Sequence, residues 1–151
     1  MGIQSMKGNV PRNQYESWLK TMPADYCAFC DIKGEQKVIE ENEGWVWVVN
    51  RRGAYLPYQT LIIPRRHIVE LSECTPEELT LMQELIQEAT QDYKKLMEEK
   101  KVPGKIMIFW RFRDESTRKN KSTDHLHLNL MPYKGEIFDH ILDPDAHLTN
   151  F

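Results

Sequence analysis

His125-Leu126-His127-Leu128-Asn129-Leu130 is the stretch that decides how this chain folds and where its chemistry lies. Side chains along an extended strand point to opposite faces with a period of two. The three leucines are therefore expected in the core, and His125, His127 and Asn129 are expected together along the other face. Three nitrogen-bearing side chains in a row are unusual on an exposed strand. Chance polar positions on a half-exposed strand would give the same pattern.

The segments before this stretch predict further strands. Residues 37–49 indicate a hairpin, with a turn at 41–44 and the two tryptophans of Trp45-Val46-Trp47 on one face. A short apolar run at 59–63, ended by Pro64, is typical of a buried strand, and residues 106–112 predict another.

A long helix is predicted between these strands. Thr75-Pro76-Glu77-Glu78 supplies an N-cap, a proline at the first helical position and a capping-box glutamate. Apolar residues then follow the 3.6-residue period at Leu79, Met82, Leu85, Ile86, Ala89, Tyr93, Leu96 and Met97. Strands, one helix and two further strands imply an α+β fold with one long helix and a mainly antiparallel sheet.

Length and composition narrow the class of protein. A chain of 151 residues, 40% hydrophobic and 28% charged, predicts one packed domain. No apolar run is long enough to cross a bilayer, and the first residues lack the apolar centre of a secretory signal. A net charge of -3 gives no general attraction to nucleic acid or to an anionic membrane. Three cysteines, two of them spaced C-x-x-C, favour a reducing, cytoplasmic location.

Several short motifs occur in one order along the chain. Cys27-x-x-Cys30 comes first, then Leu-Ile-Ile-Pro-Arg-Arg-His at 61–67, then the capped helix, then Ser-Thr-Asp-His-Leu-His at 122–127. In this order the chain resembles the histidine-triad (HIT) superfamily. The resemblance covers residues 25–132 as a HIT-like nucleotide-binding domain, and leaves 1–24 as an N-terminal extension and 133–151 as a C-terminal tail. It also implies a homodimer.

The resemblance implies a zinc site. By position, its ligands are Cys27, Cys30, His67 and His125. Thiolates and imidazoles together suit tetrahedral Zn²⁺, and four protein ligands leave no open coordination position, so this zinc would be structural. Two other interpretations of the cysteine pair stay open: a redox pair, which here lacks its usual βαβ context, and two buried thiols.

The resemblance also implies a nucleophile. His127 is the second histidine of the motif and would attack the α-phosphate of a nucleotide derivative to form a nucleotidyl-histidine. The ordinary histidine pKa, near 6.5, leaves most of the imidazole unprotonated at neutral pH. Ser122 falls where family members place a hydroxyl against the phosphate, and it would equally serve as an ordinary loop serine. Candidate substrates are dinucleoside polyphosphates, nucleoside phosphoramidates and nucleotide sugars.

Two positions depart from the usual pattern. Asn129 stands where hydrolase branches carry a histidine and the transferase branch a glutamine, and Gln59 stands where a second histidine usually occurs. A carboxamide can donate to a phosphate oxygen but cannot deliver a proton as an imidazolium does. Both residues are predicted to bind the nucleotide, with transfer, slow hydrolysis and binding without turnover all left open. A zinc module that binds nucleic acid is a weaker alternative.

Asn50 and a basic cluster complete the candidates. Asn50 resembles a ribose-binding asparagine, and a turn residue that closes the strand explains it equally well. The basic residues either attract polyphosphate or form a solvated face. They are Arg111, Arg113, Arg118, Lys119 and Lys121.

Overall fold

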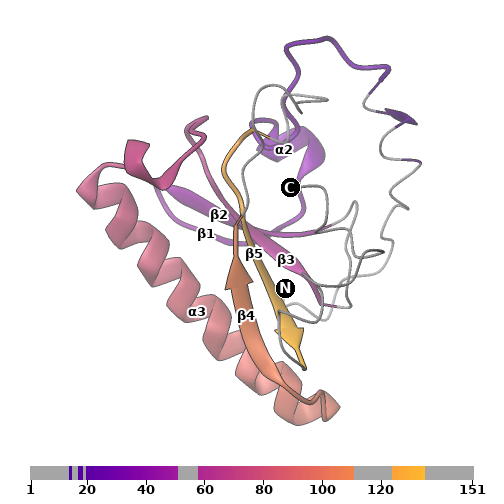
Figure 1. The fold of residues 1–151 in the computed structure, drawn as a ribbon, viewed down its shortest axis with the longest axis vertical. Coiled ribbons are helices and arrows are strands. Elements are labelled where there is room, and N and C mark those ends of the chain that lie inside the picture. Colours follow the sequence, from indigo (N-terminus) through magenta and orange to yellow (C-terminus); the bar gives the residue numbers. More distant parts are fainter. Residues whose placement is uncertain (1–13, 15–16, 19, 51–57, 111–123, 135–151) are drawn as a thin grey trace, which may run out of the picture.

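The computed structural model describes residues 14, 17–18, 20–50, 58–110 and 124–134 of the chain. In this part, five strands form one antiparallel sheet in the order β1-β2-β3-β5-β4 (Figure 1). The strands are β1 (Val38–Glu41), β2 (Trp45–Val49), β3 (Thr60–Pro64), β4 (Lys105–Phe109) and β5 (Leu128–Tyr133). The helices are α2 (Ile32–Glu35), the 3₁₀ turn η2 (Leu71–Glu73) and α3 (Pro76–Lys100). The predicted α+β fold is confirmed.

The predicted hairpin joins β1 to β2. Its turn is closed by Asn42, whose side-chain oxygen accepts hydrogen bonds from the backbone N–H groups of Gly44 and Trp45 at 3.0 and 2.9 Å. The same amide donates to the carbonyl of Leu81 at 2.9 Å. Asn42 therefore shapes the turn and ties it to α3.

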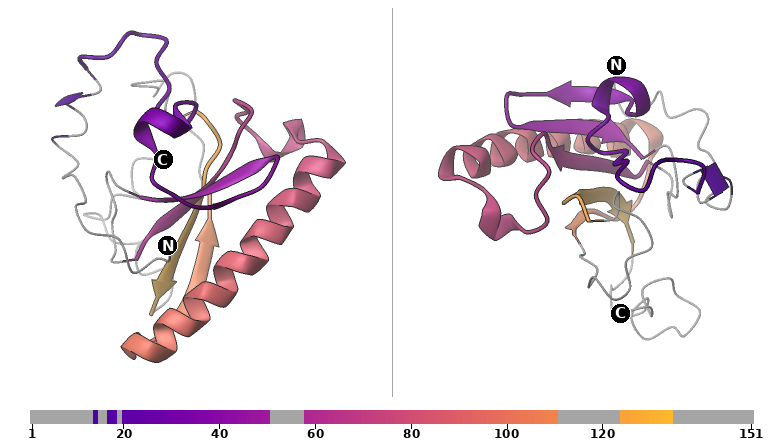
Figure 2. Two further views of the ribbon diagram at one scale, coloured as in Figure 1. Left: turned by 180° about the vertical axis from the view of Figure 1, so that it is seen from behind. Right: turned by 90° about the horizontal axis from the view of Figure 1, so that it is seen from above.

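The long helix begins where its capping motif predicts. The Thr75 hydroxyl accepts from the N–H of Glu78, and the Glu78 carboxylate accepts from the N–H of Thr75, both at 3.1 Å. Figures 1 and 2 show α3 running alongside the strands, well apart from α2. In the described residues, no helix combines the length and the apolar composition that crossing a membrane requires.

Period two in the strands gives the sheet two different faces. One face packs on α3, and its buried cluster includes Trp45, Trp47, Ile62 and the three leucines of residues 126–130. The intervening positions form a second cluster on the other face, with Val46, Val48, Leu61 and Ile63 packed against Phe29, Ile32 and Val38. By the same alternation, His127 and Asn129 lie on the face away from α3.

Strand β5 is shorter than the sequence predicts. Its ladder begins at Leu128, so His125 and His127 lie in the segment just before it. The reason is local: β3 pairs with β5 only from Ile62 back to Thr60. Beyond that point, the ring of His125 donates a hydrogen bond to the carbonyl of Pro64 at 2.7 Å. The predicted alternation is nevertheless confirmed, because the leucines at 126, 128 and 130 all enter the core.

A buried relay of hydrogen bonds ties α3 to the centre of the sheet. The Trp47 indole donates to Thr60 Oγ1 at 2.8 Å, and Thr60 Oγ1 lies 2.7 Å from the Tyr93 hydroxyl. The single proton of the Tyr93 hydroxyl is shared between the carbonyls of Tyr58 and Leu130, whose oxygens lie 2.5 and 3.0 Å away. An indole only donates and a carbonyl only accepts, so the protons run in one direction, from Trp47 through Thr60 to Tyr93. The relay fixes Tyr58, which has a left-handed φ of 64°.

Tyr93→Phe is expected to reduce the free energy of unfolding by about 1–3 kcal/mol, because the buried Thr60 hydroxyl loses its acceptor and the carbonyls of Tyr58 and Leu130 lose the proton that they share. Denaturation in urea, compared with the wild type, measures the loss. Tyr58→Phe is the matched control, since it removes a hydroxyl that plays no part in the relay and keeps the carbonyl that does. An equal loss in both variants would contradict this reading.

Candidate functional site

Four side chains from three separate segments meet at one end of the sheet. They are Cys27 and Cys30 from the turn before α2, His67 from the loop after β3, and His125 from the segment before β5. Their ligand atoms all lie within 4.8 Å of one another. Cys27 and His125 are buried, whereas Cys30 and His67 are exposed. All four residues predicted as metal ligands are thus brought together.

The spacing of these atoms fits a tetrahedral zinc ion. Bonds of about 2.3 Å to sulfur and about 2.0–2.1 Å to nitrogen place a thiolate about 3.6 Å from an imidazole nitrogen. Here, Cys30 Sγ lies 3.2 Å from His67 Nδ1 and 3.4 Å from His125 Nδ1. Cys27 Sγ lies 3.6 Å from His125 Nδ1. The donor set and its dimensions therefore suit Zn²⁺.

His125 is prepared to act as a ligand. Its Nε2 donates to the carbonyl of Pro64 at 2.7 Å, which leaves the lone pair on Nδ1, facing the two thiols. Metal-bound histidines commonly donate their other ring N–H to a carbonyl in this way. Burial lowers the pKa of His125 to about 4, while the bond to Pro64 acts in the opposite direction. The ring is therefore neutral at physiological pH.

Burial has the opposite effect on the Cys27 thiol. Burial raises the pKa of Cys27 to about 12, so its thiol keeps its proton unless a positive charge lies next to it. A bound cation reverses this preference and deprotonates the thiol. Occupancy of the site is thus linked to the charge of Cys27.

His127 lies two residues further on, outside the metal cluster. Its Nδ1 lies 2.8 Å from the carbonyl of His125. A carbonyl only accepts, so in the neutral ring Nδ1 carries the proton and the lone pair is on Nε2. The two histidines therefore present opposite nitrogens: His125 directs Nδ1 to the thiols, and His127 holds Nε2 in its basic form.

The two positions that depart from the usual pattern contact each other. Gln59 Nε2 donates to Asn129 Oδ1 at 2.9 Å, and Asn129 Nδ2 donates to the carbonyl of Phe109 at 3.4 Å. Gln59 is completely buried and Asn129 is 5% exposed. The contact between Gln59 and Asn129 follows from the register of β3 on β5, in which Leu61 pairs with Asn129. The structure thus gives Gln59 a role that the sequence did not predict, which is to hold the Asn129 amide.

A sequence model of the HIT domain matches residues 33–136, well over half of the chain. The chain belongs to the HIT family. Two curated relatives are galactose-1-phosphate uridylyltransferases. The one from Hypocrea jecorina is 35% identical over 75 residues, which are 50% of this chain and 19% of that protein. The one from Neurospora crassa is 38% identical over 74 residues, 49% of this chain and 18% of that protein. This HIT protein thus spans about a fifth of the length of these relatives.

Solved structures share the fold. A HIT family protein from Bacillus anthracis superimposes with a TM-score of 0.58 at 22% identity, covering 76% of this chain and 77% of that one. A GalT-like protein from Arabidopsis thaliana gives 0.60 at 16% identity, covering 83% and 40%. A zinc-bound histidine triad family protein from Mycobacterium smegmatis gives 0.55 at 23% identity, covering 82% and 87%. These likenesses show that the HIT fold is present.

The remaining predicted residues divide into two groups. Asn50 is buried, and its N–H donates to the carbonyl of Gln59 at 3.3 Å, as a residue that closes the strand would. Its contact with a ribose stays a prediction. Ser122 and the five basic residues from Arg111 to Lys121 lie outside the described residues.

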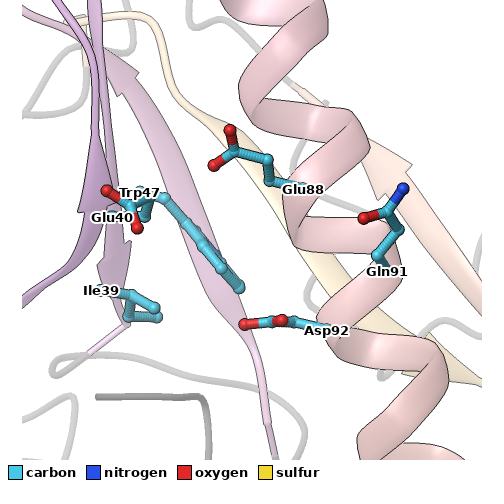
Figure 3. Close-up of a pocket in the computed structure, with 6 residues that line it drawn as sticks. All are labelled: Ile39, Glu40, Trp47, Glu88, Gln91 and Asp92. Atoms are coloured by element: carbon cyan, nitrogen blue, oxygen red, sulfur yellow. The ribbon is translucent and has the colours of Figure 1, made fainter.

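A cavity of about 210 Å³ in the HIT domain lies away from these residues, between α3 and strands β1 and β2 (Figure 3). Three carboxylates line it, together with Ile39, Trp47 and Gln91. They are Glu40, Glu88 and Asp92. None of the predicted site residues lines this cavity, so it is separate from the chemistry around His127.

Phe29 is the site residue that the sequence did not reveal. It lies inside the C-x-x-C motif, and its ring centroid is 5.0 Å from that of His127 and 5.9 Å from that of His125. The sequence did contain a signal for Phe29: an aromatic residue between two cysteines that bind a metal must lie close to that metal site.

Proposed function

We propose that this HIT domain transfers nucleotidyl groups through a covalent intermediate on His127. The observation that carries the proposal is the 2.8 Å contact between His127 Nδ1 and the His125 carbonyl, from which we infer that Nδ1 carries the proton and Nε2 the lone pair. This is the form of imidazole that can attack phosphorus. The names of the uridylyltransferase relatives support a reaction of this class.

The proposed reaction has two steps. In the first, the Nε2 lone pair forms an N–P bond with the α-phosphorus, and the P–O bond to the leaving group breaks with its electron pair on oxygen. The ring becomes positive and keeps its Nδ1 proton, which the His125 carbonyl stabilises. In the second step, the oxygen of an acceptor attacks phosphorus, and the N–P electron pair returns to Nε2.

The paired carboxamides favour phosphate as the leaving group and as the acceptor. Neither Gln59 nor Asn129 can deliver or remove a proton at neutral pH. A departing phosphate is stable as an anion and an acceptor phosphate has an ionised oxygen, so neither needs such a group. An amine does need a proton in order to leave. We therefore favour dinucleoside polyphosphates and nucleotide sugars over phosphoramidates as substrates.

The proposal is tested by offering one substrate of each kind and measuring turnover with and without an added sugar phosphate. We expect the nucleotide sugar and the dinucleoside polyphosphate to react, an acceptor phosphate to speed product formation, and the phosphoramidate to react at least about 100-fold more slowly, the usual contribution of a general acid. A phosphoramidate that turned over fastest would overturn this choice of substrate.

Binding without turnover is the second candidate. The burial of Gln59 and Asn129 and their bond to each other favour it, because these amides are already engaged within the protein. Nucleotide affinity without product, and without an adduct on His127, would support this alternative.

The metal in this proposal is a structural Zn²⁺ held by Cys27, Cys30, His67 and His125. It supplies cross-links between three chain segments, with all four positions taken by protein atoms. A zinc-bound HIT structure supports the choice of metal. A cytoplasmic location suits these ligands, because a reducing compartment keeps thiols available to the metal.

Asn129→His is expected to raise hydrolysis by about tenfold or more, because water, unlike an ionised phosphate acceptor, must lose a proton as it attacks, and an imidazole can take that proton, a contribution worth about 10²–10⁴ in adapted sites. Nucleotide affinity is expected to change less. The control is Asn129→Gln, which keeps a carboxamide. Steady-state rates and calorimetric affinities separate the two effects, and an unchanged or lower hydrolysis rate in Asn129→His would count against this role of the substitution.

We also propose a homodimer that forms along β4. This strand is at the edge of the sheet described here; Ile108 on the strand is 38% exposed, and Trp110, which follows its end, is 49% exposed. Large exposed apolar side chains at the edge strand of a sheet favour association with a second copy. Trp110→Lys is expected to shift the mass in sedimentation towards the monomer, whereas a monomeric wild type would refute the dimer.

A further inference from the structure

Phe29 occupies a fixed place between the candidate metal site and His127. The turn that carries it is closed by hydrogen bonds from the N–H groups of Cys30 and Asp31 to the carbonyl of Cys27, at 3.1 and 3.2 Å. The ring of Phe29 also packs against the apolar cluster of β2 and β3 on the face away from α3. Any group that fixes the two thiols on either side therefore also fixes this ring.

The Phe29 ring lies against the imidazole of His127. Their planes are tilted by 47°, with centroids 5.0 Å apart. The hydrogen bond from His127 Nδ1 to the His125 carbonyl holds one ring atom at 2.8 Å and does not by itself set the tilt of the ring plane. Contact with Phe29 restricts that tilt and so bears on the direction in which Nε2 points.

We propose that Phe29 is a positioning residue for His127, which aligns Nε2 and stabilises the positive ring formed when a nucleotidyl group is attached. This inference rests on the proposed role of His127 as the nucleophile. The π cloud of an aromatic ring attracts a cation within about 6 Å of its centroid, and the separation here is 5.0 Å. Attack turns the neutral imidazole into such a cation.

The first test compares variants of the zinc-loaded protein. In Phe29→Leu we expect adduct formation on His127 to slow about tenfold in single-turnover experiments, with nucleotide affinity within about twofold and metal content unchanged. Phe29→Met keeps the volume of the side chain and serves if the leucine variant does not fold. Phe29→Tyr keeps the ring and should restore most of the rate.

The matched control is Ile32→Ala. Ile32 packs against the same apolar cluster as Phe29, so this variant should lose stability without slowing adduct formation. An equal slowing in Ile32→Ala, or a wild-type rate in both Phe29→Leu and Phe29→Met, would overturn the proposal.

Proton NMR gives a readout that needs no reaction. The Phe29 ring current should displace the resonances of the His127 ring protons, assigned by comparison with His127→Ala, at about pH 8 where imidazoles are neutral. Phe29→Leu should remove the displacement, and Ile32→Ala should keep it. If the wild type shows this displacement but never forms an adduct, the positioning role stands and the proposed function fails. No change in Phe29→Leu would refute the positioning role itself.

Discussion

His127→Ala is expected to reduce nucleotide turnover by several orders of magnitude while metal content and folding stay intact. Removal of a covalent nucleophile abolishes the whole two-step route, and losses of this size are measured for such residues. His127 is partly exposed and its ring lies outside the four-ligand cluster, so the structure gives no reason for metal loss. Steady-state rates, metal analysis and thermal unfolding of the same preparation measure all three quantities.

His127→Gln is the matched control for this prediction. It keeps a polar side chain of similar length and lacks the basic nitrogen, so it should be as inactive as the alanine variant. Substantial activity in either variant would show that another group performs the attack.

His125→Ala is expected to have the opposite pattern, with loss of the metal and a large loss of stability. Its side chain is completely buried and bridges the thiols to the carbonyl of Pro64. Zinc binding is coupled to folding and is worth about 10–16 kcal/mol in small zinc domains, and a sheet with its own core should depend on it less. We expect a loss of several kcal/mol in the free energy of unfolding, measured with and without a chelator. Cys27→Ser should have the same pattern.

Cys74→Ser provides the control for the metal site. Cys74 lies just before α3, outside the four-residue cluster, so its replacement should leave one zinc per chain. Metal analysis that finds no zinc in wild-type protein purified without chelators would refute the site.

The sequence predicts those features of the fold that depend on local spacing. Alternation places the leucines at 126, 128 and 130 in the core, and the capping box locates the start of α3 at Pro76. The four candidate ligands come from the order of short motifs, and they meet in the structure. Each of these predictions needs only residues close together in the chain or a known motif order.

The contacts between distant segments could not be predicted. The bond between Gln59 and Asn129 depends on the register of β3 on β5, which no local pattern specifies. The two carbonyls that set the histidine tautomers belong to Pro64 and His125, and backbone groups carry no sequence signal of their own. The ring contact of Phe29 likewise needs the C-x-x-C turn to lie over the segment before β5.

Trapping the intermediate tests the central claim most directly. The protein is mixed with a nucleotide sugar or a dinucleoside polyphosphate, denatured within one turnover, digested and analysed by mass spectrometry at neutral to alkaline pH. We predict a mass increment of one nucleotidyl group on the peptide that carries His127, and none in His127→Ala. Two results would contradict the account: as much nucleotidylated protein in His127→Ala as in the wild type, or no nucleotidylated peptide in wild-type protein that turns the substrate over.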